Sequence, residues 1–189
     1  IESAGKKAGM PVGPLAVIDE VNLGLVARIR NQTRKDLAAE GKELPLVPAD
    51  PVIDLMTETM NRLGRANGGG FYEYPKNGKK YLWPELQTHF PPAKDPLNQD
   101  EMIERILFIQ AIETIRAYEE NVVTSVADAN IGSVFGWGFD PAIGGTLQFV
   151  NNYGIQEFEK RSKELEKKYG ERFNPPTMLK KMSSKKEMF

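Results

Sequence analysis

The stretch FGWGFDPAIGGTLQF, Phe135–Phe149, places four glycines just before an apolar run. Such glycines either cradle a phosphate between a strand and a helix or join two helices. Counted from Gly136, the spacing is Gly-x-Gly-x-x-Pro, so the third glycine of a dinucleotide fingerprint is missing, and the preceding residues have helical character. We therefore predict a junction of two helices, where one glycine ends the first helix and another lets a neighbouring backbone approach the second.

A related pattern occurs near the start of the chain. A shift of 132 positions places VGPLAVIDEV (Val12–Val21) over GGTLQFVNNY (Gly144–Tyr153), so that Gly13 matches Gly145. Two packed helix pairs would each need a glycine at this point, because a side chain there would keep the helices apart. The chain is therefore expected to contain two copies of one helical unit.

Apolar residues recur at helical spacing through most of the chain, which predicts a mainly α fold. The strongest pattern follows Asn98, a residue type that caps helices, and runs from Ile103 to Tyr118. The pair Asp50-Pro51 predicts another helix start, because aspartate suits the cap and proline suits the first turn. The predicted helices span residues 14–40, with a break near residue 24 as an alternative, 51–63, 99–118, 126–135, 141–150, 155–169 and 175–182.

The middle of the chain has a different character. The segment FYEYPKNGKKYLW, residues 71–83, alternates aromatics about Asn77-Gly78 and predicts a small β-hairpin with a two-residue turn. Residues 84–98 contain four prolines, which lack a backbone donor, so this segment is predicted to be a linker. The predicted domains are a first helical unit with the hairpin at 1–83, the linker at 84–98, a second helical unit at 99–182 and a frayed tail at 183–189.

The composition excludes several classes of function. The 25 Lys and Arg residues nearly balance the 26 Asp and Glu residues, so no global field would attract nucleic acid. No apolar run approaches the roughly 20 residues of a membrane span, so we expect neither nucleic-acid binding nor a membrane span. The absence of cysteine excludes disulfides and thiolate catalysis. With one histidine, metal-dependent catalysis is not expected, and carboxylates such as Asp19, Glu20 and Asp128 fit helix caps and surface faces better.

Taken together, these segments resemble the C-terminal helical region of 3-hydroxyacyl-CoA dehydrogenases. The resemblance is strongest to the multifunctional fatty-acid oxidation proteins that also carry an enoyl-CoA hydratase. It implies two tandem helical units of the 6-phosphogluconate dehydrogenase C-terminal-like type, which would explain the repeat. The matching stretches are GMPVGPLAVIDEV, GRANGGGFYEYP, ERILFIQAIETIRAYEENVV, SVADANIGSVFGWGFDPAIGGTLQFV and KYGERF.

The resemblance also implies a reaction, the reversible transfer of hydride from C3 of a 3-hydroxyacyl-CoA to NAD. Family members take the hydroxyl proton with a His-Glu pair and bind NAD in a Rossmann domain, both encoded upstream of this region. Because the first residue is Ile1 rather than Met, we expect the chain to be cut from a longer protein, with the first helix of copy one missing. No catalytic, cofactor-binding or metal-binding residue is expected here, and the single histidine, His89, is expected to be an exposed linker residue.

Two places are expected to meet the substrate by resemblance. Phe135 matches a tyrosine that contacts substrate in the multifunctional family, and it could offer an aromatic face to acyl or pantetheine groups. The turn Pro11-Val12-Gly13 resembles the family segment that approaches the active-site cleft. Packing alone would also explain both, and Trp137 and the hairpin aromatics are expected to be core residues.

The expected function is the substrate-side and assembly domain of an NAD-dependent 3-hydroxyacyl-CoA dehydrogenase in fatty-acid β-oxidation, inactive alone. The alternative is a free-standing helical module that binds acyl-CoA or a protein. The expected partners are fatty acyl-CoA, the chain's own upstream Rossmann domain and either a thiolase subunit or a second copy, in a bacterial cytoplasm. An apolar helix face left uncovered by a missing partner should favour self-association.

Overall fold

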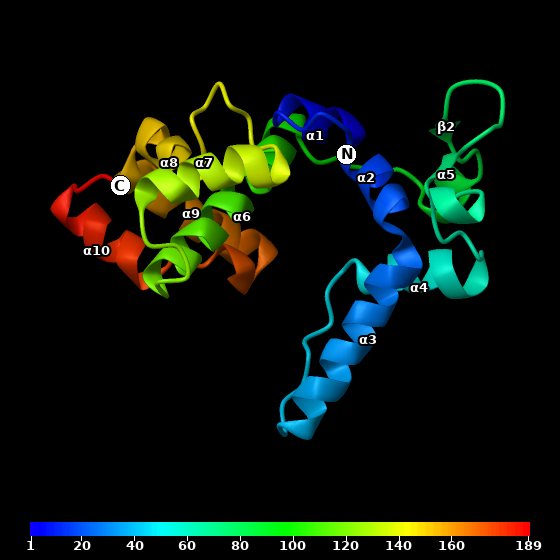
Figure 1. Ribbon diagram of the computed structural model, residues 1–189, viewed down its shortest axis with the longest axis horizontal. Helices are drawn as coiled ribbons and strands as arrows, with labels where there is room; N and C mark the ends of the chain where they lie inside the picture. The colour runs from blue at the N-terminus through cyan, green and yellow to red at the C-terminus, as the bar shows by residue number, and fades with distance from the viewer. The chain divides into compact units, whose positions relative to one another are not determined.

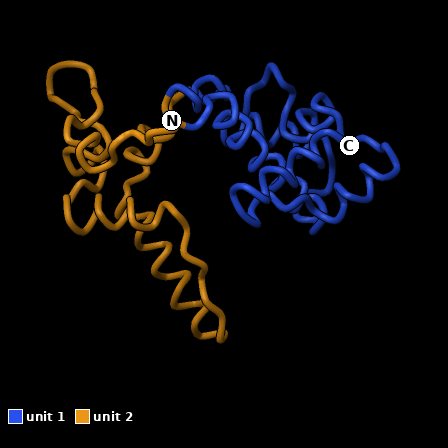
Figure 2. The backbone as a smooth tube through the Cα atoms, turned by 180° about the vertical axis from the view of Figure 1, so that it is seen from behind, with its two compact units in different colours: residues 1, 3–11, 97–189 blue, residues 2, 12–96 orange.

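The computed structural model describes residues 1–189, which form two compact units (Figure 2). Unit 1 comprises Ile1, Ser3–Pro11 and Leu97–Phe189, and unit 2 comprises Glu2 and Val12–Pro96. The fold is mainly α with one small two-stranded sheet, as the sequence predicts. None of the helices combines the length and the apolar character that a bilayer crossing requires.

Unit 1 is built on α6 (Gln99–Glu119), the long green helix of Figure 1. Its inward face carries Phe108, Ile112 and Ile115, which are fully buried at helical spacing and form the centre of the core. The neighbouring helices bury their own apolar faces against it. The other elements of this unit are α1 (Glu2–Lys7), α7 (Val126–Trp137), α8 (Thr146–Tyr153), α9 (Ile155–Tyr169), the 3₁₀ turn η3 (Glu171–Phe173) and α10 (Thr177–Lys185).

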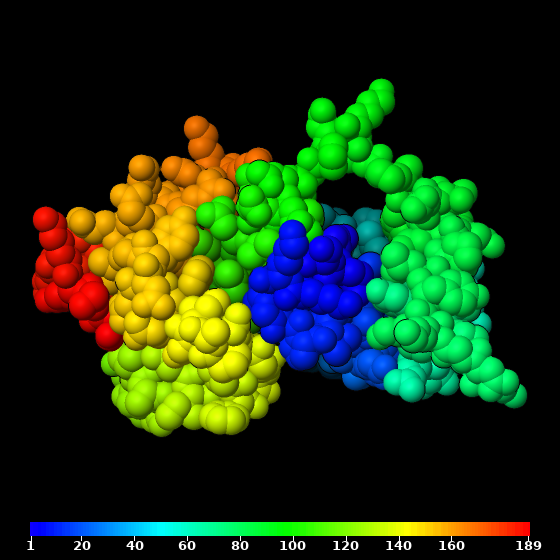
Figure 3. Space-filling model, turned by 90° about the horizontal axis from the view of Figure 1, so that it is seen from above, coloured from blue at the N-terminus to red at the C-terminus, as the bar shows by residue number.

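The N-terminal residues pack onto the body of unit 1. Figure 3 shows the blue N-terminal segment beside the green start of α6 and the yellow residues that follow α7. Gln99 links them, because its Nε2 donates to Ser3 Oγ (2.8 Å) and its Oε1 accepts from Lys7 Nζ (2.6 Å). Gly9, with φ of 92°, lies so close to Asp140 that a Cβ atom would overlap that side chain. The two ends of the sequence therefore share one unit.

Unit 2 has a smaller core. Leu23, Ile53 and Met56 pack with the aromatic rings of Phe71 and Trp83. The helices supply the aliphatic side and the sheet segment supplies the aromatic side. The elements of this unit are α2 (Pro14–Val21), α3 (Leu23–Ala39), α4 (Asp50–Asp54), a π-helical turn η1 (Leu55–Thr59), a 3₁₀ turn η2 (Arg65–Asn67), β1 (Tyr72–Glu73), β2 (Tyr81–Leu82) and α5 (Leu86–His89).

The repeat in the sequence is also a repeat in the structure. Helices α2 and α8 begin and end at positions 132 residues apart, and α3 and α9 begin with the same offset. The residue between the two helices is Asn22 in copy one and Gly154 in copy two, with φ/ψ of 84°/114° and 90°/118°. The same sharp corner therefore joins the helix pair in both copies.

Several predicted boundaries differ from the structure. The first long helix breaks at Asn22 rather than near Gly24, because Asn22 adopts a positive φ there. Helix α7 ends at the left-handed Gly138 (φ 76°), two residues after the predicted Gly136. Helix α8 begins at Thr146 rather than at residue 141, since Gly144 and Gly145 have φ of 90° and 103° and interrupt the helical path.

The predicted hairpin exists, but its two-residue turn is wrong. Tyr72 pairs with Leu82 and Glu73 with Tyr81, so residues 74–80 form the connection. Pairing stops there because Pro75 lacks a donor. The predicted linker also contains the short helix α5, in which the His89 ring stacks on Trp83 with centroids 5.3 Å apart, so His89 is not a freely exposed linker residue.

The tail is more ordered than predicted. Helix α10 continues to Lys185, and the last residue, Phe189, is held at its backbone. Its N–H donates to Asn151 Oδ1 and its carbonyl accepts from Asn151 Nδ2, both at 3.0 Å. Periodicity and capping motifs do not predict this contact, because it joins residues 151 and 189, which are far apart in the chain.

Candidate functional site

The turn at Pro11–Gly13 leads directly into α2. Gly13 is the N-cap residue, and a Cβ atom there would overlap the carboxylate of Glu2. That carboxylate replaces a side-chain cap, since Glu2 Oε1 accepts from the N–H of Leu15 (2.5 Å) and Oε2 accepts from the hydroxyl of Tyr72 (2.7 Å). Gly13 therefore has a local packing role, while the neighbouring Val12 stays 39% exposed.

In the second copy, a side-chain amide caps the first turn of the matching helix, α8. The side-chain oxygen of Asn130, on α7, accepts from the N–H groups of Leu147 (2.9 Å) and Gln148 (3.1 Å) in the first turn of α8. Gly145 leaves the space for this, because a Cβ atom there would overlap the backbone of Asn130. The predicted helix junction with a close backbone approach is confirmed.

The same geometry does not fit a dinucleotide. A pyrophosphate cradle needs free amides between a strand and a helix. Here the glycines follow a helix, and Asn130 already accepts from the first free N–H groups of α8. These residues therefore do not fit a dinucleotide site.

Phe135 lies in the last turn of α7, and Pro11 comes from the N-terminal segment. Phe135 is 86% exposed, so it is a surface aromatic rather than a core residue. Pro11 packs beside Gly138, the last cap of α7, with its Cδ 3.8 Å from the position of a Cβ there. Trp137 was predicted to be core but is 55% exposed, and its Nε1 donates to Gln110 Oε1 (2.9 Å). Two large aromatic rings thus face outward within one turn of helix.

An apolar groove of about 590 Å³ runs between α6 and α7. Gly132 and Gly136 open it, because neither carries a side chain that could fill the space. Ile109 and Ala129 line it, and Trp137 stands at one wall. The volume lies within the range of small-molecule sites.

Asp19 of unit 2 lies in a different environment from the one predicted. It was assigned to a cap or surface face, but it is 1% exposed and accepts from the backbone N–H groups of Phe71 (2.8 Å) and Tyr72 (2.9 Å) and from the hydroxyl of Tyr74 (3.0 Å). Burial, reinforced by Asp19, raises the pKa of Tyr74 above its usual value. One signal was present in the sequence, since an aspartate on the apolar face of a helix needs donors.

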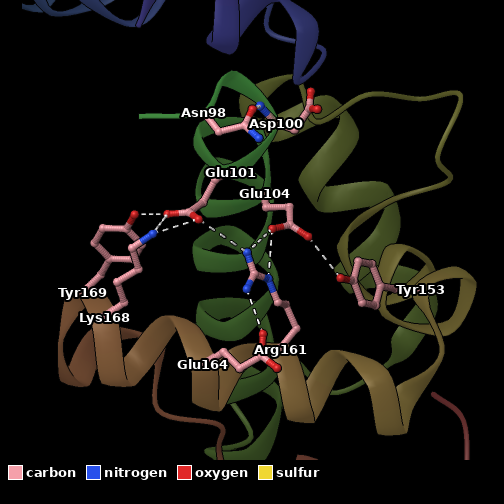
Figure 4. Close-up of polar contacts among 9 residues, drawn as sticks. All are labelled: Asn98, Asp100, Glu101, Glu104, Tyr153, Arg161, Glu164, Lys168 and Tyr169. Carbon is pink, nitrogen blue, oxygen red and sulfur yellow. Dashed lines mark hydrogen bonds and ion pairs between the residues drawn. The ribbon is translucent and has the colours of Figure 1, made fainter. Parts of the chain in front are cut away.

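A polar network joins α6 to α8 and α9 in unit 1 (Figure 4). Glu104 accepts from Arg161 Nη2 (2.6 Å) and Nε (3.0 Å) and from the hydroxyl of Tyr153 (3.1 Å). These bonds raise the pKa of Arg161. Burial and the Glu104 carboxylate raise the pKa of Tyr153 to about 12. One turn earlier, Glu101 accepts from Lys168 Nζ (2.7 Å) and from the hydroxyl of Tyr169.

The matching face of copy one is uncovered. Four apolar side chains, here called the α2–α3 stripe, lie at every fourth position and are 38% to 57% exposed: Val17, Val21, Leu25 and Ile29. Adding 132 to the first two gives Phe149 and Tyr153, whose rings pack edge-on against Phe108 of α6 at 5.8 and 5.0 Å between centroids. In copy two, helix α6 therefore packs against the equivalents of Val17 and Val21, which stay exposed in copy one.

The fold and the duplicated helix pair define a mainly α protein built on a repeated pair of helices. Residues 1–74 match the family model described as 3-hydroxyacyl-CoA dehydrogenase, C-terminal domain, which confirms the resemblance. The chain is also similar in structure to the dehydrogenase part of multifunctional enzyme 1 from C. elegans, with a TM-score of 0.63 and 15% sequence identity. The match covers 96% of this chain and 41% of that one, so this chain spans less than half of that protein's length.

Proposed function

We propose that this chain is the substrate-side and assembly domain of an NAD-dependent 3-hydroxyacyl-CoA dehydrogenase of fatty-acid β-oxidation. The observation that carries the proposal is the family match of residues 1–74 together with a second copy of the same helix pair. NAD would accept the hydride, and the groups that hold it and take the substrate proton would come from another part of the parent protein. The domains are proposed at 1–83, 84–98 and 99–182, with a tail at 183–189.

The substrate side is assigned to the end of α7. Phe135 and Pro11 would offer an aromatic and an aliphatic surface to acyl or pantetheine groups of a fatty acyl-CoA, with Val12 and Gly13 continuing the turn. The 86% exposure of Phe135 supports this role, because a ring of that size gains free energy when a ligand covers it.

The assembly side is assigned to the α2–α3 stripe. In copy two, α6 packs against the equivalents of Val17 and Val21, so this part of the stripe should accept an amphipathic helix that presents an apolar face in the same way. We assign that helix to the parent dehydrogenase. A thiolase subunit, a second copy of the chain, an attached hydratase and a bacterial cytoplasmic location remain further parts of the proposal.

Kinetics of the full protein encoded by the gene test this function. We expect it to oxidise NADH in the presence of acetoacetyl-CoA, whereas the 189-residue chain alone does not. In the full protein, Phe135→Ala should lower kcat/KM for acyl-CoA about tenfold. Ile131→Ala, at another exposed position of α7, should leave kcat/KM unchanged.

These measurements test the dehydrogenase assignment and the substrate role of Phe135 separately. A full protein without NADH oxidation but with saturable acyl-CoA binding would support the alternative, a helical binding module, which the groove between α6 and α7 favours. An active full protein in which Phe135→Ala has no effect would reject the substrate role of Phe135 and leave the dehydrogenase assignment in place.

A further inference from the structure

A second cavity in unit 1, of about 340 Å³, lies on another side of α6. Its wall is mostly apolar and includes Ile1 and Ala4 of the N-terminal segment, Leu97, and Met102, Ile106, Ile109 and Phe173. Two arginines border it, Arg105 and Arg172. The volume would hold a short apolar chain of about ten heavy atoms. No role for this cavity follows from the proposed function.

Arg105 has no carboxylate partner. It takes part in no salt bridge or side-chain hydrogen bond of the chain, and its Nε is buried without an acceptor. The guanidinium rests on the ring of Tyr169 at 3.9 Å, which compensates the charge only in part. The nearest carboxylate along α6, Glu101, is already engaged by Lys168 and by the hydroxyl of Tyr169. The guanidinium of Arg105 is thus partly buried without an anion, which is unfavourable for the charged group.

Arg172 adds a second positive charge. Its guanidinium lies over the Phe173 ring at 5.3 Å and pairs with no carboxylate. Burial first, and repulsion from Arg172 second, lower the pKa of Arg105, so the two cations are close enough to disfavour each other. By contrast, Arg62 and Arg161 are paired with carboxylates at 2.9 and 2.6 Å.

We propose that this cavity binds a small amphiphilic anion, with a carboxylate or phosphate head between Arg105 and Arg172 and an apolar chain along Ile106 and Phe173. The head would supply the counter-charge that Arg105 lacks, and a planar guanidinium suits a bidentate contact with either head group. The chain would cover the apolar wall.

Calorimetric titration of the 189-residue chain tests the site without NAD or turnover, so its outcome is independent of the proposed function. The probes are octanoate, octyl phosphate, inorganic phosphate and octanol. We expect one equivalent of octanoate or octyl phosphate to bind, with inorganic phosphate and octanol at least tenfold weaker. The tighter of the two anions identifies the head group.

Substitutions of the two arginines test which of them binds the head group of the anion. Arg105→Met should weaken the tighter anion at least tenfold, as the loss of a charged hydrogen bond does, and Arg172→Met should weaken it severalfold. Arg28→Met, at an exposed arginine of α3, is the matched control and should change nothing. The melting temperature of Arg105→Met should not fall, since the variant removes an unpaired charge. Equal affinity for octanol and octanoate, or unchanged affinity in Arg105→Met, would overturn the proposal.

Discussion

Asp19 and Asn151 occupy the same position in the two copies and hold different partners by the same chemistry. Asp19 accepts from two backbone N–H groups of the aromatic segment, and Asn151 exchanges two hydrogen bonds with the backbone of Phe189. A short polar side chain on the inner face of α2 or α8 therefore attaches a distant segment to the helix pair. Such a group must be paired, because it is desolvated.

The first prediction concerns Asp19. Asp19→Asn replaces one acceptor oxygen by a donor that faces other donors, so the free energy of unfolding should fall by about 1–3 kcal/mol. Asp36→Asn, at an exposed position of α3, should change it by less than about 0.5 kcal/mol. Urea denaturation followed by circular dichroism measures both. Equal effects of the two substitutions would contradict the role given to Asp19.

A second prediction concerns the pH dependence of Tyr153. Its pKa is raised from 10.0 to about 12 in the folded chain, so the unfolded chain loses this proton first as the pH rises. The contribution of Tyr153 to stability is therefore complete below pH 10 and is lost between pH 10 and 12. The difference in unfolding free energy between the wild type and Tyr153→Phe should shrink across that window. A difference that stays constant from pH 9 to 12 would show that the pKa of Tyr153 is the same in the folded and the unfolded chain, which would contradict the prediction.

At the scale of elements, the sequence predicted what local chemistry determines. The Asn98 cap is present, with Asp100 N donating to Asn98 Oδ1 (3.0 Å), and so is the Ser125 cap of α7. The corner at Asn22 was misplaced because a positive φ at asparagine leaves no mark in the hydrophobic pattern. The start of α8 was misplaced because its N–H groups are satisfied by Asn130, from a different helix. The exposure of Phe135 and Trp137 depends on which helices pack together, which periodicity does not specify.

Two glycines test the helix junction. Gly145→Ala should lower the free energy of unfolding by at least about 2 kcal/mol, because φ is 103° and the new Cβ would overlap Asn130. Gly132→Ala has open space within α7 and should raise it by about 0.5–1 kcal/mol. Thermal and urea denaturation of the pair provide the comparison. Similar values for the two variants would argue against a close contact at Gly145.

At the scale of the whole molecule, the chain holds two copies of one helix pair, and only one is covered by a long helix of its own. Helix α6 packs its apolar face, through Phe108, against copy two and also bonds to copy two through the polar Glu104 network. The α2–α3 stripe has no such cover, and exposed stripes of this kind drive association.

Self-association of the isolated chain should therefore depend on the stripe. In sedimentation equilibrium we expect the average mass to rise with concentration for the wild type and to stay monomeric for the double variant Val21→Lys, Ile29→Lys. Leu46→Lys, at an exposed apolar residue in a loop, should behave as the wild type. A wild-type chain that is monomeric throughout would show that the stripe needs no cover.

In the proposed function, this chain lies beside the substrate, and NAD is held elsewhere in the parent protein. Calorimetric titration of NADH into the full protein and into the 189-residue chain tests it most directly. We expect one NADH to bind per full protein and no saturable binding to the 189-residue chain alone. Tight, stoichiometric NADH binding by the 189-residue chain would contradict it.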